Sequence, residues 1–364
     1  MQYTAIPIDQ LSAEQLETWG RLQQADSRLD SPYFRPEFAQ AVAAVRSGSE
    51  VAVLEDAGRP VGFLPYHRTR TNVGLPIAGS MTDFQGAVVQ PGVAWDVADL
   101  LRTCRLKALC FDHLLAEQSE FQRFHWCEAT SPFVDLTHGF EAYRQQNKSR
   151  TLSGALQKMR KAERRVGPLR LESCITDCRV FQTLIAWKTN QYARTRVRNL
   201  FDTSWTLELL ERVLTLRTAG LTGMLSALYL GDRLAAASLD MRSWGVLHVW
   251  FPAYDVELSQ YSAGLLLLVR LAQEAQALGI QRIDLGKGPE EFKYHLLTGA
   301  TTVAEGAADL RPLARTVRRW WAGLRDFARR SRWYRPARLV VRQASSLYRA
   351  GRAWWTRRSA VGPE

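Results

Sequence analysis

Residues 280–294 read IQRIDLGKGPEEFKY, and this stretch decides how we interpret the fold. Ile283 and Leu285 flank Asp284 in the alternation that is typical of a buried strand. Two glycines and a proline follow, and they predict an irregular turn. The charged side chains gathered around the end of this strand are Asp284, Lys287, Glu290, Glu291 and Lys293. Charge collected where a buried strand ends predicts a functional site, and we expect these five side chains to contact a substrate.

A long apolar helix pattern at residues 265–278 precedes the strand. The order of helix, strand, glycine turn and aromatic-lysine pair resembles the GNAT superfamily of acyltransferases. The residues that carry the resemblance are Asp284-Leu285-Gly286 and Phe292-Lys293. They resemble most the tandem-domain branch that includes cellulose and exopolysaccharide biosynthesis acetyltransferases and is close to the FemAB-like peptidoglycan aminoacyltransferases. The resemblance implies an α/β fold of two tandem GNAT-like domains, each with a mixed, mostly antiparallel sheet.

The charge of the chain is concentrated at one end. The 364 residues carry a formal net charge of +12, but residues 311–364 hold 15 arginines, no lysine and two acids, so residues 1–310 carry a net charge of −1. A chain of this length and apolar content can bury two cores of ordinary size. We therefore expect two domains followed by a basic tail.

Cysteine and histidine usage argues against cross-links and metal. The five cysteines form no CxxC pair and the six histidines are scattered, so neither a disulfide framework nor a zinc site is supported and we expect no metal. The N-terminus lacks the basic and apolar regions of a secretory signal. The longest uncharged run, near residues 258–269, is shorter than the roughly 20 residues that span a bilayer. These features predict a cytoplasmic protein with reduced thiols.

Two segments of the chain predict similar β-hairpins. Residues 51–68 and 225–242 both read as strand, tight turn and strand, and Arg59 and Arg68 have the same spacing as Arg233 and Arg242. Equal spacing indicates a duplicated unit, although any two hairpins look alike at this level. Both interpretations stay open on the residues alone, and the tandem-domain resemblance favours duplication.

The segment SPFVDL at residues 131–136 predicts the crossover between the two domains. We expect an N-terminal GNAT-like domain at 1–130, a C-terminal GNAT acyltransferase domain at 131–310, and a helical tail at 311–364. A basic helix is predicted at 143–166. It is either a solvated helix face or a basic wall for phosphates or an anionic acceptor.

Residues 254–264 read YDVELSQYSAG and lead into the apolar helix. A helix N-terminus offers unpaired N–H groups and a positive dipole end, which together bind phosphate. The resemblance implies that an acyl-CoA, such as acetyl-CoA, is held there by its pyrophosphate, with Ser262 as a cap and Gly264 allowing close approach. The residues of this predicted donor site are Gln260, Ser262, Ala263, Gly264 and Leu265. Ala263 and Leu265 replace the two glycines of the superfamily signature, so a capped helix without a ligand stays the alternative.

The second hairpin predicts a catalytic pair. A three-residue loop, Ser243-Trp244-Gly245, would place Asp240 opposite His248 and Ser238 opposite Trp250 on one face of the sheet. Asp240 would then orient His248 as a general base, a role that suits histidine near neutral pH. A shift of one residue in the register would remove the pair and leave His248 a cross-strand packing residue.

Lys293 stands at the aromatic-lysine position of the resemblance. An ammonium group fixed behind a glycine-rich turn can hold an anionic or hydroxylated acceptor, or neutralise a developing oxyanion. The alternative is a lysine on the surface. Glu290 and Glu291 can equally serve as partners of a helix dipole.

The tail predicts two arginine-rich amphipathic helices separated by Arg335-Pro336. Their apolar stripes carry Trp320, Trp321, Trp354 and Trp355. Tryptophan opposite arginine suits an anionic membrane surface, where aromatic rings settle at headgroup depth. We favour a membrane over a docking partner, and either over nucleic acid.

Taken with the resemblance, these features predict an acyltransferase that moves an acyl group from acyl-CoA to a hydroxyl or amine of a sugar-containing acceptor in polysaccharide or cell-envelope biosynthesis. It would lie on the inner face of the membrane, with a membrane synthase complex as a further partner. Two alternatives stay open: a FemAB-like aminoacyltransferase that uses aminoacyl-tRNA, and a non-catalytic scaffold of a membrane synthase complex.

Overall fold

The computed structural model describes residues 1–311 together with Thr316, Trp320 and Gly323. The strands in this part of the chain are β1 (Gln2–Pro7), β2 (Ser49–Asp56), β3 (Arg59–Arg68), β4 (Val73–Leu75), β5 (Val88–Val89), β6 (Ala108–Leu115), β7 (His125–Asp135), β8 (Leu169–Ile175), β9 (Thr222–Leu230), β10 (Arg233–Ser243), β11 (Val246–Tyr254), β12 (Arg282–Asp284) and β13 (Gly299–Asp309). The α-helices are α1 (Ala13–Ala25), α2 (Pro36–Ala43), α3 (Val97–Thr103), α4 (Gly139–Gln146), α5 (Arg150–Arg165), α6 (Cys178–Thr195), α7 (Ser204–Thr215), α8 (Ala263–Glu274) and α9 (Glu291–Leu296).

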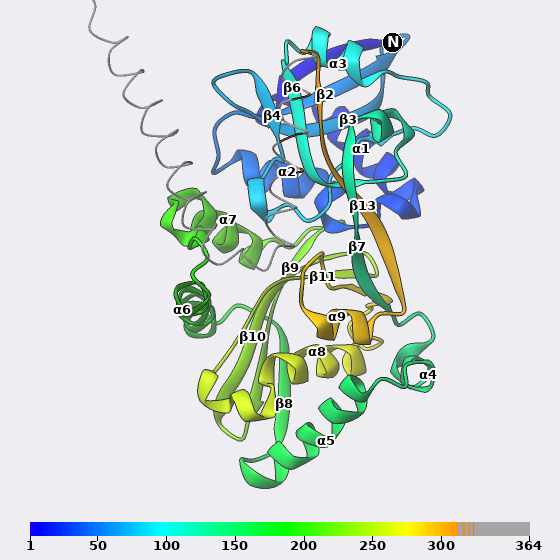
Figure 1. Ribbon diagram of the computed structural model, residues 1–364. Helices are drawn as coiled ribbons and strands as arrows, with labels where there is room; N and C mark the ends of the chain where they lie inside the picture. The colour runs from blue at the N-terminus through cyan, green and yellow to red at the C-terminus, as the bar shows by residue number, and fades with distance from the viewer. Residues whose placement is uncertain (312–315, 317–319, 321–322, 324–364) are drawn as a thin grey trace, which may run out of the picture. The chain divides into compact units, whose positions relative to one another are not determined.

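All these strands belong to one mixed sheet. Its order is β1-β2-β3-β4-β6-β13-β7-β12-β11-β10-β9-β8, with β5 paired to β3. The β4–β6 and β11–β12 pairs are parallel and the other strand pairs are antiparallel. The two long strands β7 and β13 run from the N-terminal half of the sheet, which contains β1 to β6, to the C-terminal half, which contains β8 to β12 (Figure 1). Residues 1–310 consequently form one compact unit, and the domain boundary at residue 131 stays a prediction.

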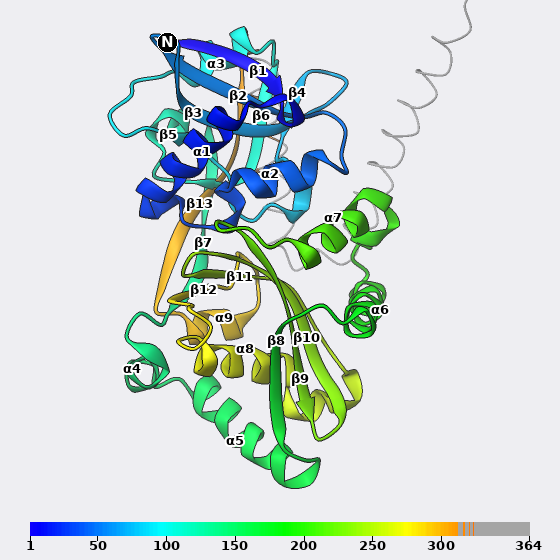
Figure 2. The same ribbon diagram turned by 180° about the vertical axis from the view of Figure 1, so that it is seen from behind.

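Helices cover both faces of the C-terminal half of the sheet (Figures 1 and 2). On one face, α5 and α8 pack together, and α5 contributes Leu152, Ala155, Met159 and Ala162 to the shared core. On the other face, α6 and α7 pack over β9, β10 and β11. The core on this second face continues into the N-terminal half, since Phe38 and Trp250 belong to the same buried cluster. Side chains from both halves therefore meet at their junction.

A local capping motif begins the first helix, and the two predicted hairpins are confirmed. Ser12 and Gln15 form a reciprocal capping box at the start of α1, with hydrogen bonds of 3.2 and 3.0 Å. Both hairpins form, and β3 and β10 begin at Arg59 and Arg233 as their sequence spacing predicts. The predicted basic helix is divided, because Asn147 ends α4 and Ser149 caps α5.

Of residues 311–364, the structure describes Arg311, Thr316, Trp320 and Gly323 alone. The two predicted amphipathic helices thus lie outside the described residues and stay predictions. Among the helices of the described part of the chain, none is long and apolar enough to cross a membrane.

Candidate active site

His248 on β11 and Asp83 in the loop before β5 meet at the junction of the two halves. Nε2 of His248 lies 3.0 Å from Oδ2 of Asp83, so the imidazole N–H donates a hydrogen bond to the carboxylate. Tyr33 packs edge-on against the imidazole, with ring centroids 4.9 Å apart. Two residues farther along β11, Trp250 donates its indole N–H to the carbonyl of Met81 at 3.2 Å. These contacts fix the Asp83 loop against β11.

Asp83 is the member of this pair that faces solvent. The side chain of His248 has no exposed surface, whereas that of Asp83 is 27% exposed. Burial by itself would raise the pKa of the Asp83 carboxyl, but the hydrogen bond from His248 and the charges of His248, His113 and Lys293 outweigh it and hold that pKa below its ordinary value. Asp83 is therefore ionised at neutral pH and can accept a proton or a hydrogen bond.

The glycine turn after β12 closes against this pair. Gly286 has a φ of +71°, and a Cβ at this position would lie 3.3 Å from Oδ2 of Asp83. Only glycine adopts this conformation without strain and leaves room for the carboxylate. Lys293 on α9 donates to the Gly286 carbonyl at 3.3 Å and pairs with Glu290 at 3.2 Å. The structure thus brings the predicted residues Lys293 and His248 together, and Asp83, from a distant part of the chain, lies next to them.

The predicted pairing of Asp240 with His248 is wrong. The hairpin closes with a two-residue loop, Trp244-Gly245, so that Ser243 pairs with Val246. Trp244 has a φ of 50°, and loops of this length with positive φ match the natural twist of the two strands. This loop places Met241 opposite His248, and a β-bulge between Leu239 and Met241 then shifts the register further, so that Ser238 pairs with Pro252 instead of Trp250.

Asp240 sits in this bulge as a buried carboxyl. Its Oδ1 accepts the backbone N–H of Trp250 at 3.1 Å and the hydroxyl of Ser238, and its buried Oδ2 has no hydrogen-bond partner among the described residues. Burial raises the pKa of Asp240 to about 6, against the opposing effects of Ser238, Trp250 and His248. Asp240 therefore stabilises the β11 backbone, and a catalytic role for it stays a prediction.

The other predicted substrate residues occupy different positions. Asp284 is buried in an ion pair with Arg282 at 2.9 Å, and Arg282 also binds Asp30 at 2.7 Å. Lys287 donates to the backbone carbonyl of Asp112 at 2.6 Å, so it links the glycine turn to β6. Glu291 is exposed at the start of α9. Of the five, Glu290 and Lys293 lie at the cluster formed by Asp83, His248 and Lys293, which we call the Asp83 cluster. Asp284 instead binds Arg282, and Lys287 holds the glycine turn against the N-terminal half.

At the predicted donor site, the expected capping by Ser262 is wrong. Ser262 adopts a left-handed conformation with a φ of 57°, and its side chain makes no capping bond. Its hydroxyl instead accepts a hydrogen bond from Nζ of Lys158 on α5 at 2.8 Å. Leu265 donates its N–H to the carbonyl of Ser262, but the N–H groups of Ala263 and Gly264 have no acceptor among the described residues. The first turn of α8 thus offers two unpaired donors beside an ammonium group.

Strand β11 connects the donor site to the Asp83 cluster. Its pairing with β12 ends at His248, and β11 continues to Tyr254 with no described strand on that side. The six residue steps from His248 to Tyr254 span roughly 20 Å at the usual rise of a strand. Gln260 lies exposed in the short helix η7 (Val256–Tyr261) that joins β11 to α8. Between the α8 N-terminus and Asp83, one side of β11 is therefore unpaired by any described strand.

Several residues near these sites had no signal in the sequence. Asp83 lies in an irregular loop, 165 positions from its partner His248. Lys188 on α6 donates to the carbonyl of Pro252 at 3.0 Å, and its burial lowers its pKa to about 8 even though Glu290 opposes that shift. Lys158 was predicted only as one member of a basic helix. Their proximity to the site depends on tertiary contacts, which periodicity does not encode.

Histidine, cysteine and carboxylate side chains come together in many metal sites. Within the described ranges, no group of three such side chains is arranged to hold a metal ion.

Comparison with known proteins gives a family for part of the chain. Residues 149–294 match the family model described as an acetyltransferase (GNAT) domain. This match includes α5, the whole donor loop, His248 and Lys293. A comparison with curated proteins gave no match. The matched domain indicates an enzyme of the acyltransferase class.

Solved structures extend the similarity to most of the chain. FemX is 8% identical with a TM-score of 0.55, and the similarity covers 84% of this chain and 96% of FemX. L-PGS from Bacillus licheniformis is 11% identical with a TM-score of 0.52, covering 85% and 95% of the two chains. A tandem GNAT protein from the clavulanic acid biosynthesis pathway is 13% identical with a TM-score of 0.52, covering 85% and 99%. At these identities the comparisons show a shared tandem GNAT-like fold.

Proposed function

We propose that this protein transfers an acyl group from acyl-CoA to a hydroxyl or amine of a sugar-containing acceptor in polysaccharide or cell-envelope biosynthesis. The observation that carries the proposal is the first turn of α8, where two backbone N–H groups are unpaired beside Lys158 within the segment that matches the GNAT domain. Such a turn suits the pyrophosphate of a CoA thioester because backbone donors, the helix dipole and an ammonium group all favour negative charge.

The distance between the α8 N-terminus and Asp83 also supports acyl-CoA as the donor. The pyrophosphate and the thioester of an acyl-CoA lie at opposite ends of a long arm. The open edge of β11 runs roughly 20 Å from Tyr254 to His248. With the pyrophosphate on Ala263 and Gly264, an arm along this edge delivers the thioester to Asp83 and Lys293.

The reaction needs a proton acceptor and a group that tolerates developing negative charge. The acceptor oxygen or nitrogen attacks the thioester carbonyl, the tetrahedral intermediate collapses, and the C–S bond breaks to give the acylated sugar and the thiolate of CoA. The proton lost by the acceptor ends on the CoA sulfur. We assign proton transfer to Asp83, the partly exposed carboxylate, and stabilisation of the oxyanion to Lys293.

His248 then acts through Asp83. Because its side chain has no exposed surface, it orients the carboxylate and stabilises its ionised form by the 3.0 Å hydrogen bond. Sequence reasoning expected His248 to be the base and Asp240 to orient it. In the proposed mechanism His248 is a positioning residue. Asp83 takes the proton from the acceptor and passes it to the CoA sulfur.

The donor is tested by calorimetry of the full chain with acetyl-CoA and with longer acyl-CoAs. We expect saturable binding that Lys158→Ala weakens about tenfold or more, since hydrogen bonds to charged groups are worth about 1.5–3 kcal/mol. Lys161→Ala is the matched control, because Lys161 is exposed on the same helix with no ion pair among the described residues. Absence of acyl-CoA binding would refute the proposed donor.

An aminoacyl-tRNA donor is the alternative. It is favoured by Ala263 and Leu265, which replace the two glycines of the superfamily signature. Incubation with aminoacyl-tRNA in place of acyl-CoA separates the two, because consumption of the charged tRNA without acyl-CoA binding would assign the chain to the FemAB-like activity. Attachment to an anionic membrane and membership of a synthase complex are proposals for residues 311–364, outside the described residues.

A further inference from the structure

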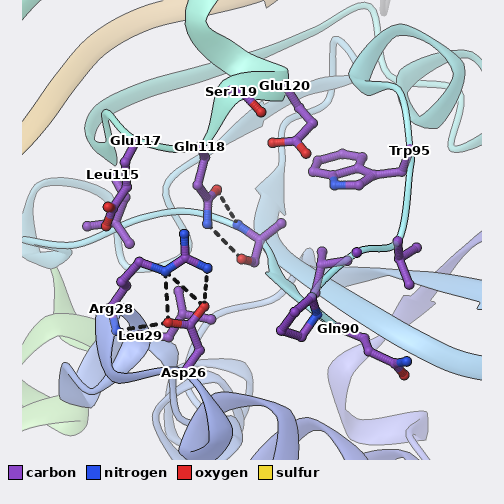
Figure 3. Close-up of a pocket in the computed structure, with 15 residues that line it drawn as sticks. Asp26, Arg28, Leu29, Gln90, Trp95, Leu115, Glu117, Gln118, Ser119 and Glu120 are labelled. Atoms are coloured by element: carbon purple, nitrogen blue, oxygen red, sulfur yellow. Dashed lines mark hydrogen bonds and ion pairs between the residues drawn. The ribbon is translucent and has the colours of Figure 1, made fainter.

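A cavity of about 170 Å³ lies in the N-terminal half, away from the residues assigned to acyl transfer. We name it the Trp95 pocket, and Figure 3 shows the side chains that line it. Those that matter for recognition are Asp26, Arg28, Trp95, Glu117, Gln118 and Glu120. Glu120 lies beside the indole of Trp95, and the Asp26–Arg28 pair lies on the opposite side (Figure 3).

Contacts within the protein hold the walls of this pocket in place. Arg28 donates to both carboxylate oxygens of Asp26 at 2.6–3.1 Å, and these hydrogen bonds hold the pKa of Asp26 below its ordinary value. Gln118 binds both backbone groups of Ala87, at 3.0 and 2.8 Å. Trp95 packs edge-on against Phe121, with centroids 5.6 Å apart. A preformed wall of this kind loses little entropy when a ligand binds.

The polar side chains that face the opening of the pocket are available to bind a ligand. In the described part of the chain, the side chains of Gln90, Glu117, Ser119 and Glu120 make no hydrogen bond or ion pair. The charges of Asp26 and Arg28 cancel, so Glu117 and Glu120 give the pocket a net charge of −2. Both carboxylates act electrostatically on Arg28, which places them around the same opening.

A second cavity lies next to the first. It measures about 350 Å³ and shares Arg28 and Glu117 with the Trp95 pocket. Phe84, which follows Asp83 in the chain, lines this second cavity, as does Arg282. The hydroxyl of Ser31, another lining residue, is buried without a hydrogen-bond partner among the described residues. The two cavities therefore adjoin at Arg28 and Glu117, and the second lies against the loop of Asp83 at Phe84.

We propose that the Trp95 pocket binds sugar residues of an extended acceptor at a distance from the point of acyl transfer, with preference for a chain that carries amino groups. A pyranose ring has an apolar C–H face, which suits the flat indole, and a rim of hydroxyls, which suits carboxylate and amide side chains. The two glutamates favour a protonated amine and disfavour an anionic chain. This proposal rests on the proposed function, because it names the class of acceptor that the same enzyme would use.

Binding of oligosaccharides without any donor tests the proposal. We would titrate the full chain with the β-1,4-linked glucosamine tetramer, with cellotetraose and with free glucosamine by calorimetry. The glucosamine tetramer is expected to bind at least tenfold more tightly than glucosamine, and more tightly than cellotetraose at low salt. Glu117→Ala should weaken tetramer binding about tenfold. Glu163→Ala, an exposed glutamate on α5, is the matched control and should leave binding unchanged.

A second variant and a kinetic measurement test the pocket proposal independently. Trp95→Ala should also abolish the advantage of the tetramer, and circular dichroism would check that it folds, while Glu117 is exposed and its removal leaves the packing intact. Failure of the tetramer to bind, or equal binding to wild type and Glu117→Ala, overturns the pocket proposal. Because no acyl-CoA is present, tetramer binding that depends on Glu117 supports the pocket even if the donor titration fails. In turnover, Glu117→Ala should raise KM for the tetramer and leave KM for glucosamine unchanged.

Discussion

Replacing Asp240 with asparagine should change how the stability of the protein depends on pH. The Asp240 carboxyl is fully buried and its pKa is raised from 3.8 to about 6. The folded state therefore keeps a proton that the unfolded chain has already released between these two pH values. For a carboxyl with a raised pKa, the stabilising contribution is present below the unfolded pKa and is lost as pH rises through the folded pKa.

The size of the effect follows from the pKa shift. A difference of about 2.2 pKa units, at 1.36 kcal/mol each, corresponds to about 3 kcal/mol of free energy of unfolding. Asparagine keeps an oxygen that can accept the bonds from Ser238 and Trp250, and it does not ionise. The free energy of unfolding of Asp240→Asn minus that of wild type should thus rise by most of this amount, about 2 kcal/mol or slightly more, between pH 4 and pH 7.

Urea unfolding followed by tryptophan fluorescence at a series of pH values measures this difference. Every other titrating group is common to both proteins, so it cancels in the subtraction. Asp232→Asn, in the exposed turn between β9 and β10, is the control and should show a flat difference. A flat profile for Asp240→Asn would refute the conclusion that Asp240 holds its proton to about pH 6. A rise centred well below pH 5 would refute it equally.

Three further predictions address catalysis, packing and the tail. Asp83→Asn should lower kcat by about 10²–10⁴ and leave the Kd for acetyl-CoA unchanged in calorimetry, and an unchanged kcat would remove Asp83 from proton transfer. Gly220→Ala should destabilise the protein by about 2–4 kcal/mol in urea unfolding, because its Cβ would lie 1.8 Å from the buried guanidinium of Arg35. In the control Gly154→Ala, on α5, the added Cβ meets nothing within 4 Å, so this variant should be neutral or slightly stabilising. Equal Cm values for the two variants would contradict this. Deletion of residues 311–364 should leave a folded protein that binds acyl-CoA but no longer co-sediments with anionic liposomes, in contrast to a salt-sensitive association of the full chain, and an unfolded truncation would instead assign the tail a structural role.

Much of the local structure could be predicted because short-range chemistry dictates it. The apolar alternation around Gly58 and Gly231 marked two hairpins. The glycine turn after Asp284 was also predicted, and Lys293 lies against it. These features depend on hydrogen bonds and backbone conformations within a few residues, so the local sequence contains the information.

The register of the second hairpin was decided by a bulge and by a two-residue loop. A single inserted residue changes which side chains face each other, and the sequence around Asp240 has no glycine or proline that marks the bulge. The partner of His248 was likewise decided by the junction of the two halves. Asp83 reaches it because β7 and β13 bring the halves into one sheet, where Tyr33, Phe38 and Trp250 share a core.

By itself, then, the sequence determined the two hairpins, the strand around Asp284, the glycine turn and the sharp division of charge between residues 1–310 and the tail. The tertiary structure alone decided that Asp83 partners His248, that Lys158 rather than a serine cap stands at the α8 N-terminus, and that the Trp95 pocket adjoins a cavity at the Asp83 loop. The physical reason is the separation in sequence between the residues that interact. Periodicity and capping act over a few residues, whereas a site at the junction of two halves depends on packing between residues more than a hundred positions apart.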